Sequence, residues 1–261
     1  MPNKTHDQPL MPTRFVSGEN HASRAADFLP TFLYFSACDL SAGRPEIRSH
    51  HVFLRGGVGA MQIVLFPHPA LRFPSVDVQK IDDALRSTVR RMFDLMYELK
   101  GVGLAANQVG LPFRFFIVNP SGDPEKKDEE QVFINPNISS RRGSNVHEEG
   151  CLSLPKIYSD VERPAEITID AFDLNGQSQK RKIKGFLARV IQHEYDHVEG
   201  FLFTDRIEED QHDQIYDAIL EVAAQFRKQQ AEGLFPGDEA LLAGCQEMAK
   251  AGRVPAEFAT A

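Results

Sequence analysis

The stretch QHEYDH, residues 192–197, places two histidines four positions apart with a glutamate directly after the first. On an α-helix, positions i and i+4 lie one turn apart on the same face, so His193 and His197 could direct both imidazoles at one metal ion. Glu194 would then lie beside that ion without binding it. The spacing predicts a catalytic metal site on a helix, with a chance match on a polar helix face as the alternative.

The residues around this stretch favour the metal interpretation. Phe186 and Val190 fall on the same helical stripe as the two histidines, so the histidines share a face with apolar residues that should be buried. A buried histidine pair needs partners, and one metal ion would satisfy both imidazoles at once. Because a hydrolytic metal site usually has three protein ligands and an open position for water, a third ligand must come from elsewhere.

Two residues are candidates for this third ligand. Glu221, on a later predicted helix, would complete a metallopeptidase site with His193 and His197. Cys151, in the segment EEGCLSLP, follows a glycine that allows the backbone to come close to a site. A lone cysteine is more often a small core residue than a ligand, so these residues by themselves leave both alternatives open.

The elements that must position these residues can be predicted from the surrounding patterns. Apolar residues at helical spacing predict three helices, at 81–101, 185–200 and 212–230. Segments rich in β-branched and aromatic residues predict a short strand after Met61 and further strands at 113–118, 131–138, 165–173 and 178–184. The LNGQ turn joins the last two strands as a hairpin. Helices segregated from mostly antiparallel strands indicate an α+β fold.

Length, charge and cysteine content exclude several classes of protein. The chain has 261 residues, 42% of them hydrophobic, which suits one main domain with appendages. A net charge of -8 argues against a protein that grips a nucleic-acid backbone, so we expect no DNA partner. Three cysteines without CxxC spacing suit a reducing compartment. The sequence has no apolar run long enough for a membrane span, and we expect a cytoplasmic protein.

The two ends of the chain differ from its middle. Residues 1–60 show no sustained periodicity, and they are expected to be either a functional extension or a misassigned start, with Met61 as the true initiator. Residues 61–207 are the expected catalytic domain, followed by a C-terminal helix at 208–230. Residues 231–261 have little pattern, which predicts a loose tail.

Three motifs together resemble those of the peptide deformylases. GVGLAANQVG (101–110), EGCLS (149–153) and QHEYDH (192–197) match the signature motifs of that family in order and spacing. Its members remove the formyl group from the N-terminal methionine of newly made bacterial and organellar proteins. The resemblance implies an α+β fold in which antiparallel sheets surround a central helix that carries the HExxH motif.

The resemblance also implies a role for individual residues. Glu194 is the implied general acid and base, and the Gln108 side chain and the Leu152 backbone N–H are the implied donors to the developing oxyanion. The resemblance favours Fe(II) as the metal ion, and the same donors also accept Zn(II), Ni(II) or Co(II). A water is the implied fourth ligand. The implied protein ligands are Cys151, His193 and His197.

Other residues are expected to contact the substrate, an N-formylmethionyl nascent polypeptide. Gly103 belongs to the loop implied to pair with the substrate backbone. Val102, Phe186 and Val190 are expected to line a pocket for the methionine side chain, which is compatible with a core role. Glu149 is expected either to bind the backbone of the first residue or to face solvent.

Charged residues elsewhere have alternative explanations. Arg163 matches a frequent family arginine near the site, and a surface salt bridge is the alternative. Asp196 could orient a metal ligand or be a solvated helix charge. The C-terminal helix carries six acidic residues between Glu208 and Glu221, so we expect no more than weak, transient contact with the ribosome.

Overall fold

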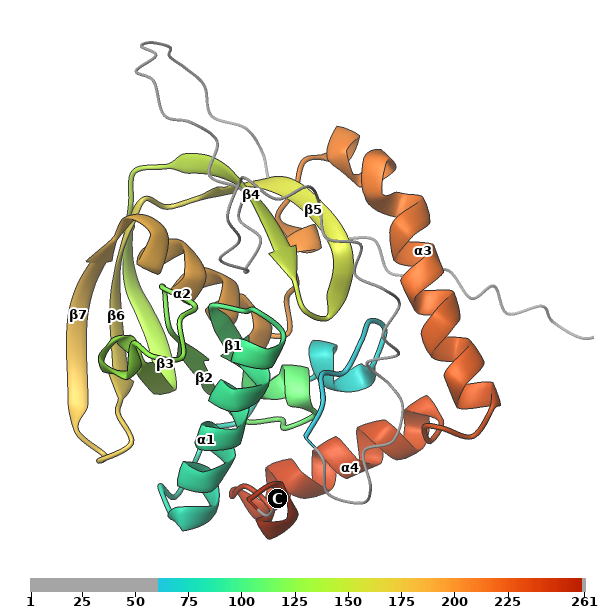
Figure 1. The fold of residues 1–261 in the computed structure, drawn as a ribbon, viewed down its shortest axis with the longest axis horizontal. Coiled ribbons are helices and arrows are strands. Elements are labelled where there is room, and N and C mark those ends of the chain that lie inside the picture. Colours follow the sequence, from blue (N-terminus) through green and yellow to red (C-terminus); the bar gives the residue numbers. More distant parts are fainter. Residues whose placement is uncertain (1–60, 260–261) are drawn as a thin grey trace, which may run out of the picture. The chain divides into compact units, whose positions relative to one another are not determined.

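A computed structural model describes residues 61–259 of the chain (Figure 1). The extension expected over residues 1–60 lies outside the described residues. The described part has four α-helices and seven strands in two antiparallel sheets, which confirms the α+β fold class. Among residues 61–259, no helix combines the length and apolar character needed to cross a membrane.

The helices and strands follow one another in an irregular order. The helices are α1 (Asp83–Glu98), α2 (Gly185–Val198), α3 (Glu209–Ala231) and α4 (Asp238–Ala251). The strands are β1 (Gly103–Ala105), β2 (Phe115–Val118), β3 (Gln131–Arg142), β4 (Asn145–Cys151), β5 (Leu154–Arg163), β6 (Glu166–Phe172) and β7 (Ser178–Lys184). The structure confirms seven elements that were predicted from the sequence: the helices α1, α2 and α3 and the strands β2, β3, β6 and β7.

The strands form a five-stranded sheet and a separate hairpin. The larger sheet has the order β1-β2-β3-β6-β7, and every neighbouring pair in it is antiparallel. Among the strands of residues 61–259, β4 and β5 pair only with each other, with Asn145 opposite Arg163 and Glu149 opposite Ser159. Helix α3 packs along this hairpin (Figure 1).

Helix α2 is buried on nearly all sides. Its apolar residues, among them Ile191 and Val198, join a core with side chains of β2, β3 and β6. Ten of its fourteen residues are buried, and six of these ten are polar or charged. Because a buried polar group without a partner is costly, the polar residues of α2 must bind one another, neighbouring strands or a ligand.

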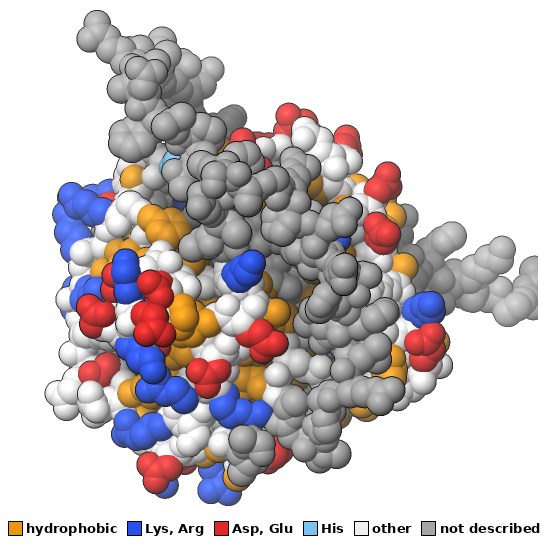
Figure 2. All heavy atoms as spheres, in the orientation of Figure 1, with side chains coloured by type: hydrophobic (Ala, Val, Ile, Leu, Met, Phe, Trp, Pro, Cys, Tyr) orange, Lys and Arg blue, Asp and Glu red, His pale blue; other side chains and the backbone are white. Residues whose placement is uncertain are grey.

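The exposed side of the larger sheet carries paired charges. Lys182 and Lys184 on β7 lie 2.7 and 3.0 Å from the carboxylate of Glu166 on β6, and Lys180 lies 3.2 Å from Asp170. Figure 2 shows basic and acidic side chains interleaved on the left side of the view, where β6 and β7 lie in Figure 1. Opposite charges directly across two strands stabilise the pairing of these strands.

Two predicted elements differ in the structure. The loose tail predicted for 231–261 contains α4, whose Cys245 is buried, and Val254 beyond it joins the main core. Leu241, Cys245 and Met248 lie at helical spacing, but only Cys245 is fully buried in α4, so the apolar pattern is short and weak in the sequence. The prediction of a strand after Met61 is also wrong. Residues 61–65 form no strand, although the Val64 N–H donates a single hydrogen bond to the Gln108 carbonyl at 2.8 Å.

Three strands were not predicted. They are β1, β4 and β5. Strand β1 has only three residues, too few to show a pattern. Strand β4 reads NVHEEGC, and its buried end consists of Glu149, Gly150 and Cys151 rather than alternating apolar residues. A strand that buries polar groups at a site does not show the alternation from which strands are predicted.

Candidate metal centre

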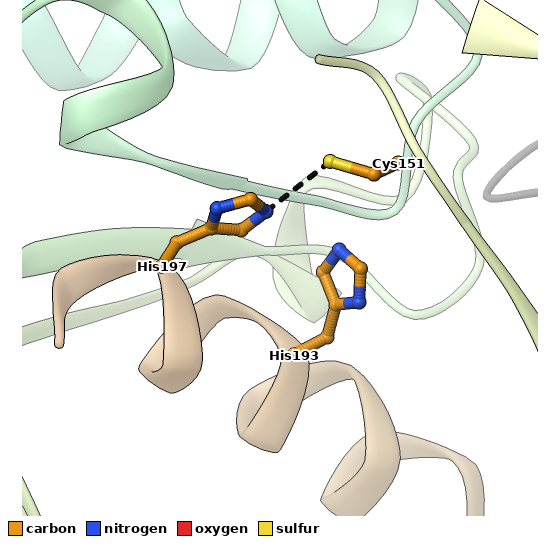
Figure 3. A group of neighbouring side chains, drawn as sticks. All are labelled: Cys151, His193 and His197. Carbon is orange, nitrogen blue, oxygen red and sulfur yellow. Dashed lines mark hydrogen bonds between the residues drawn. The ribbon is translucent and has the colours of Figure 1, made fainter. Parts of the chain in front are cut away.

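Three side chains from two separate elements meet between α2 and the end of β4. The potential ligand atoms of Cys151, His193 and His197 all lie within 4.8 Å of one another. Cys151 Sγ is 3.3 Å from His197 Nε2, and the centroids of the two imidazole rings are 5.0 Å apart. Figure 3 shows both histidines extending from successive turns of α2, with Cys151 facing them from the strand. The i, i+4 spacing therefore has the geometry predicted for it.

The donor set of this cluster fits a divalent transition metal. One thiolate and two imidazoles leave a fourth tetrahedral position free, as hydrolytic metal sites require. Burial raises the pKa of the Cys151 thiol to about 12 and lowers the pKa of His197 well below its usual value. The protein alone thus holds a neutral thiol beside a neutral imidazole, and a cation would supply the positive charge that stabilises a buried thiolate.

A buried carboxylate orients His193. His193 Nδ1 lies 3.0 Å from Glu149 Oε2, so Nε2 is the nitrogen left for a metal. Arg163 donates from Nε to Glu149 Oε1 at 2.6 Å and from Nη2 to Oε2 at 2.9 Å. Burial alone would raise the pKa of Glu149, but Arg163 and His193 together hold it well below the usual range. Glu149 is therefore held as a carboxylate beside His193.

Glu194 lies against strand β1. Its side chain is 2% exposed, and its Oε2 atom has no hydrogen-bond partner in the part of the chain that the structure describes. Burial, with the nearby negative charge of Glu149, raises the pKa of Glu194 well above its usual value. A Cβ atom added to Gly103 would lie 2.4 Å from Glu194 Oε1, so only glycine lets β1 come this close. A carboxyl group with a raised pKa suits proton transfer near neutral pH.

Gln108 directs its amide nitrogen at the cluster. Its Oε1 accepts a hydrogen bond from the Ala105 backbone N–H at 2.9 Å, and its Nε2 lies 3.4 Å from both Cys151 Sγ and Ser153 Oγ. Leu152 follows Cys151 directly, so its backbone N–H is adjacent to the cluster as well. A side-chain donor thus lies next to Cys151, and the Leu152 backbone N–H follows that residue in the chain.

Comparisons with known proteins point to one family. The model of the family described as polypeptide deformylase matches residues 60–213. The chain belongs to the polypeptide deformylase family. A peptide deformylase of Rhodopirellula baltica is 43% identical over 185 residues, covering 70% of this chain and 90% of that protein. It follows that the chain is a hydrolase that removes N-terminal formyl groups.

Relatives outside bacteria show the same likeness. Peptide deformylase 1B of Arabidopsis thaliana, named as chloroplastic/mitochondrial, is 40% identical over 173 residues, covering 66% of this chain and 62% of that protein. The crystal structure of a peptide deformylase from Plasmodium falciparum matches with a TM-score of 0.62 at 38% identity, covering 65% of this chain and 98% of that one. The family fold therefore accounts for the described α+β core.

Several residues lie where the sequence did not predict them. Glu149 is fully buried, with both oxygens bound by protein groups, so it neither faces solvent nor is free for a substrate backbone. Arg163 does not form a surface salt bridge, because it is only 4% exposed. It also donates to Asp196 at 2.8 Å. Asp196 in turn is buried and accepts from Arg206 at 2.7 Å, so it is not a solvated charge.

The predicted apolar residues separate into two groups. Val102 and Val190 are buried in the core beneath α2. Phe186 is 40% exposed at the start of α2, so the predicted buried stripe does not extend to it. Glu221 is exposed on α3 and, among the described residues, is not part of the Cys151 cluster, so the metallopeptidase alternative is not favoured.

One buried residue near the site was not predicted at all. Arg189 is 3% exposed and donates to Glu149 Oε1 at 2.6 Å. Its position in the sequence could have indicated its burial, because Arg189 precedes His193 by four residues and shares the helix face that was predicted to be buried. An arginine on a buried face needs an anionic partner, and none could be assigned from local spacing.

Proposed function

We propose that this deformylase acts on N-formylmethionyl nascent polypeptides with one divalent metal ion held by Cys151, His193 and His197. The observation that supports the proposal is the buried cluster of one sulfur and two imidazoles beside Glu194. We propose Fe(II) as the ion, as expected from the family, with Zn(II), Ni(II) or Co(II) able to use the same donors. When bound, the ion would polarise the formyl carbonyl and make water a better nucleophile.

Glu194 is the proposed proton carrier of the reaction. It would take a proton from the attacking water and later give it to the leaving amine. Its raised pKa supports this role, because a carboxyl group that titrates nearer neutrality both accepts and releases a proton efficiently. The unpaired Oε2 atom leaves one oxygen free for water.

Gln108 and the Leu152 backbone N–H are the proposed oxyanion donors. Attack on the formyl carbon puts negative charge on the former carbonyl oxygen, and donors fixed in advance lower the barrier. The bond from Ala105 N–H to Gln108 Oε1 supports the proposal, because it holds Nε2 toward the site. Losing one such donor typically costs about 3 to 4 kcal/mol of barrier.

The substrate is proposed to lie along β1. Gly103 would pair with the peptide backbone, and β1 supports this as an edge strand of the larger sheet. We propose that Phe186, with Val102 and Val190 behind it, lines the pocket for the methionine side chain. The 40% exposure of Phe186 supports contact with a ligand, whereas the other two act through the core. We do not propose Glu149 as a substrate contact, because His193 and two arginines already bind its carboxylate oxygens.

We also propose how the chain is organised around this chemistry. Residues 61–207 would be the catalytic domain, with α2 as the central helix between the five-stranded sheet and the β4–β5 hairpin. Residues 208–230 would be a C-terminal helix whose acidic residues allow only weak, transient ribosome contact. Ribosome co-sedimentation of the parent and of a variant cut after residue 207 tests this. A cytoplasmic location and the role of residues 1–60 stay predictions.

The decisive experiment measures formate release from formyl-Met-Ala-Ser by protein purified without oxygen in the presence of iron. Rapid turnover by the parent and loss in Glu194→Ala, with metal retained in both, is the expected result. Turnover by Glu194→Ala at the parent rate would contradict the proposed proton transfer. Cys151→Ser separates the two ligand sets: a site that used Glu221 would keep its metal and activity, whereas the proposed site loses both.

A further inference from the structure

The proposed metal ligands come from two separate pieces of structure. His193 and His197 belong to α2, whereas Cys151 ends β4 in the separate β4–β5 hairpin. Their mutual distances depend on how the helix is held against the hairpin. Three donors must stay within a few tenths of an ångström of their proper positions to bind one ion tightly.

Arg189 connects the helix directly to both strands of that hairpin. Its Nη1 donates to Glu149 Oε1 on β4 at 2.6 Å and to the Val161 carbonyl on β5 at 3.0 Å. Its Nη2 donates to the Asn145 carbonyl and to Asn145 Oδ1, both at 2.7 Å. A guanidinium that is 3% exposed and makes four hydrogen bonds is rigidly held.

Arg189 also binds the carboxylate that orients His193. Arg163 donates to both oxygens of Glu149 and so holds the plane of the carboxylate from β5. Arg189 adds a bond to Oε1 from α2, and His193 Nδ1 lies at Oε2. The carboxylate that faces His193 is thus held both from the hairpin and from the helix.

A second connection lies further along the same helix. Arg163 on β5 donates to Asp196 on α2, three residues after His193. Arg189 lies four residues before His193. The helix is therefore tied to the hairpin on both sides of its first histidine, and removing one connection weakens its attachment to the hairpin on that side.

We propose that Arg189 is a positioning residue that sets the spacing between Cys151 and the two histidines and thereby determines the affinity for the metal ion. This inference rests on the proposed ligand set. Arg189 does not touch the metal or the substrate. It acts through Glu149 and through the hairpin strands.

The test measures metal affinity directly. Co(II) is titrated into the metal-free parent, Arg189→Met and Arg189→Lys, with binding followed by the thiolate-to-cobalt charge-transfer absorption and by competition with a chelator. Loss of a group that orients a metal ligand typically weakens binding about 10- to 100-fold, and we expect this for Arg189→Met. Arg189→Lys keeps one charged bond to Glu149 but cannot also reach Asn145, so its affinity should be intermediate.

Arg114→Met is the matched control. Arg114 is partly buried and donates to Glu199, the residue that caps α2, at 2.6 Å and to the Pro136 carbonyl at 2.8 Å. Its hydrogen bonds within residues 61–259 do not involve Glu149 or the hairpin, so its loss should lower thermal stability without changing Co(II) affinity. Equal losses of affinity in the Arg114 and Arg189 variants would overturn the inference, because the effect would then follow stability alone.

Further measurements distinguish a failure of this inference from a failure of the proposed function. Excess metal should restore most of the formate release of Arg189→Met but none of that of Glu194→Ala. If Arg189→Met does not fold, Asn145→Ala removes one acceptor of Arg189 and should weaken Co(II) binding in the same direction but less. Parent-like affinity in Asn145→Ala and Arg189→Lys would refute the positioning role. A parent that binds Co(II) through sulfur but releases no formate would instead refute the proposed function.

Discussion

Replacing Gly103 with alanine adds one methyl group where β1 meets Glu194. The new Cβ would lie 2.4 Å from Glu194 Oε1 and 2.9 Å from its Cδ, whereas ordinary contacts begin at 3.4 Å. The backbone at Gly103 is not left-handed, so alanine introduces no backbone strain. Restoring an ordinary contact therefore requires the carboxyl group to move by about 1 Å, and a misplacement of about 1 Å can reduce turnover about 100-fold.

The assay is steady-state formate release from formyl-Met-Ala-Ser, with metal content measured on the same samples. Gly103→Ala should lower kcat about 100-fold while the metal content stays at the parent level, because Glu194 is not a proposed ligand. Gly244→Ala in α4 is the control, since nothing lies within 4 Å of the added methyl group, and its kcat should be unchanged.

Three results would refute this reasoning. A kcat and a KM of Gly103→Ala both within twofold of the parent would mean that turnover does not depend on the exact position of the Glu194 carboxyl group. An unchanged kcat with a strongly raised KM would mean that the methyl group acts on the substrate backbone rather than on Glu194. Loss of metal would place Glu194 closer to the ligand set than we propose.

Three further outcomes are expected. Gln108→Leu should lower kcat about 100- to 1000-fold with KM nearly unchanged, because the amide acts mainly in the transition state; an equal rise in KM would contradict this. Cys151→Ser should abolish the thiolate-to-cobalt absorption and most of the formate release, and retention of both would point to another third ligand. Burial lowers the pKa of His68 to about 4, so the unfolded chain binds a proton that the folded protein excludes, and stability is lost as pH falls from 6.5 toward 4. From this shift, the free energy of unfolding falls by about 3 kcal/mol at most. Chemical denaturation of the parent and of His68→Asn at several pH values should show this contribution only in the parent. Parallel pH profiles for the two proteins would show that His68 does not carry this dependence.

Local spacing was enough to predict part of the site. The two histidines of QHEYDH lie one turn apart on any α-helix, so their common direction follows from helix geometry alone. The amphipathic pattern of α1 and the hairpin of β6 and β7 are likewise local. The three motifs in order predicted the family, which the family match over residues 60–213 confirms.

The partners of buried charges were decided only by the tertiary structure. The sequence predicted solvent or substrate for Glu149, a surface ion pair as one alternative for Arg163, and nothing for Arg189, yet these three form one buried group behind His193. These three residues lie up to 40 positions apart, so no periodic pattern relates them. Helix periodicity acts over four residues, whereas an ion pair depends on which surfaces pack together. The sequence by itself thus determined the residues that can hold a metal, and the packing of α2 against the β4–β5 hairpin determined the charges that hold those residues in place.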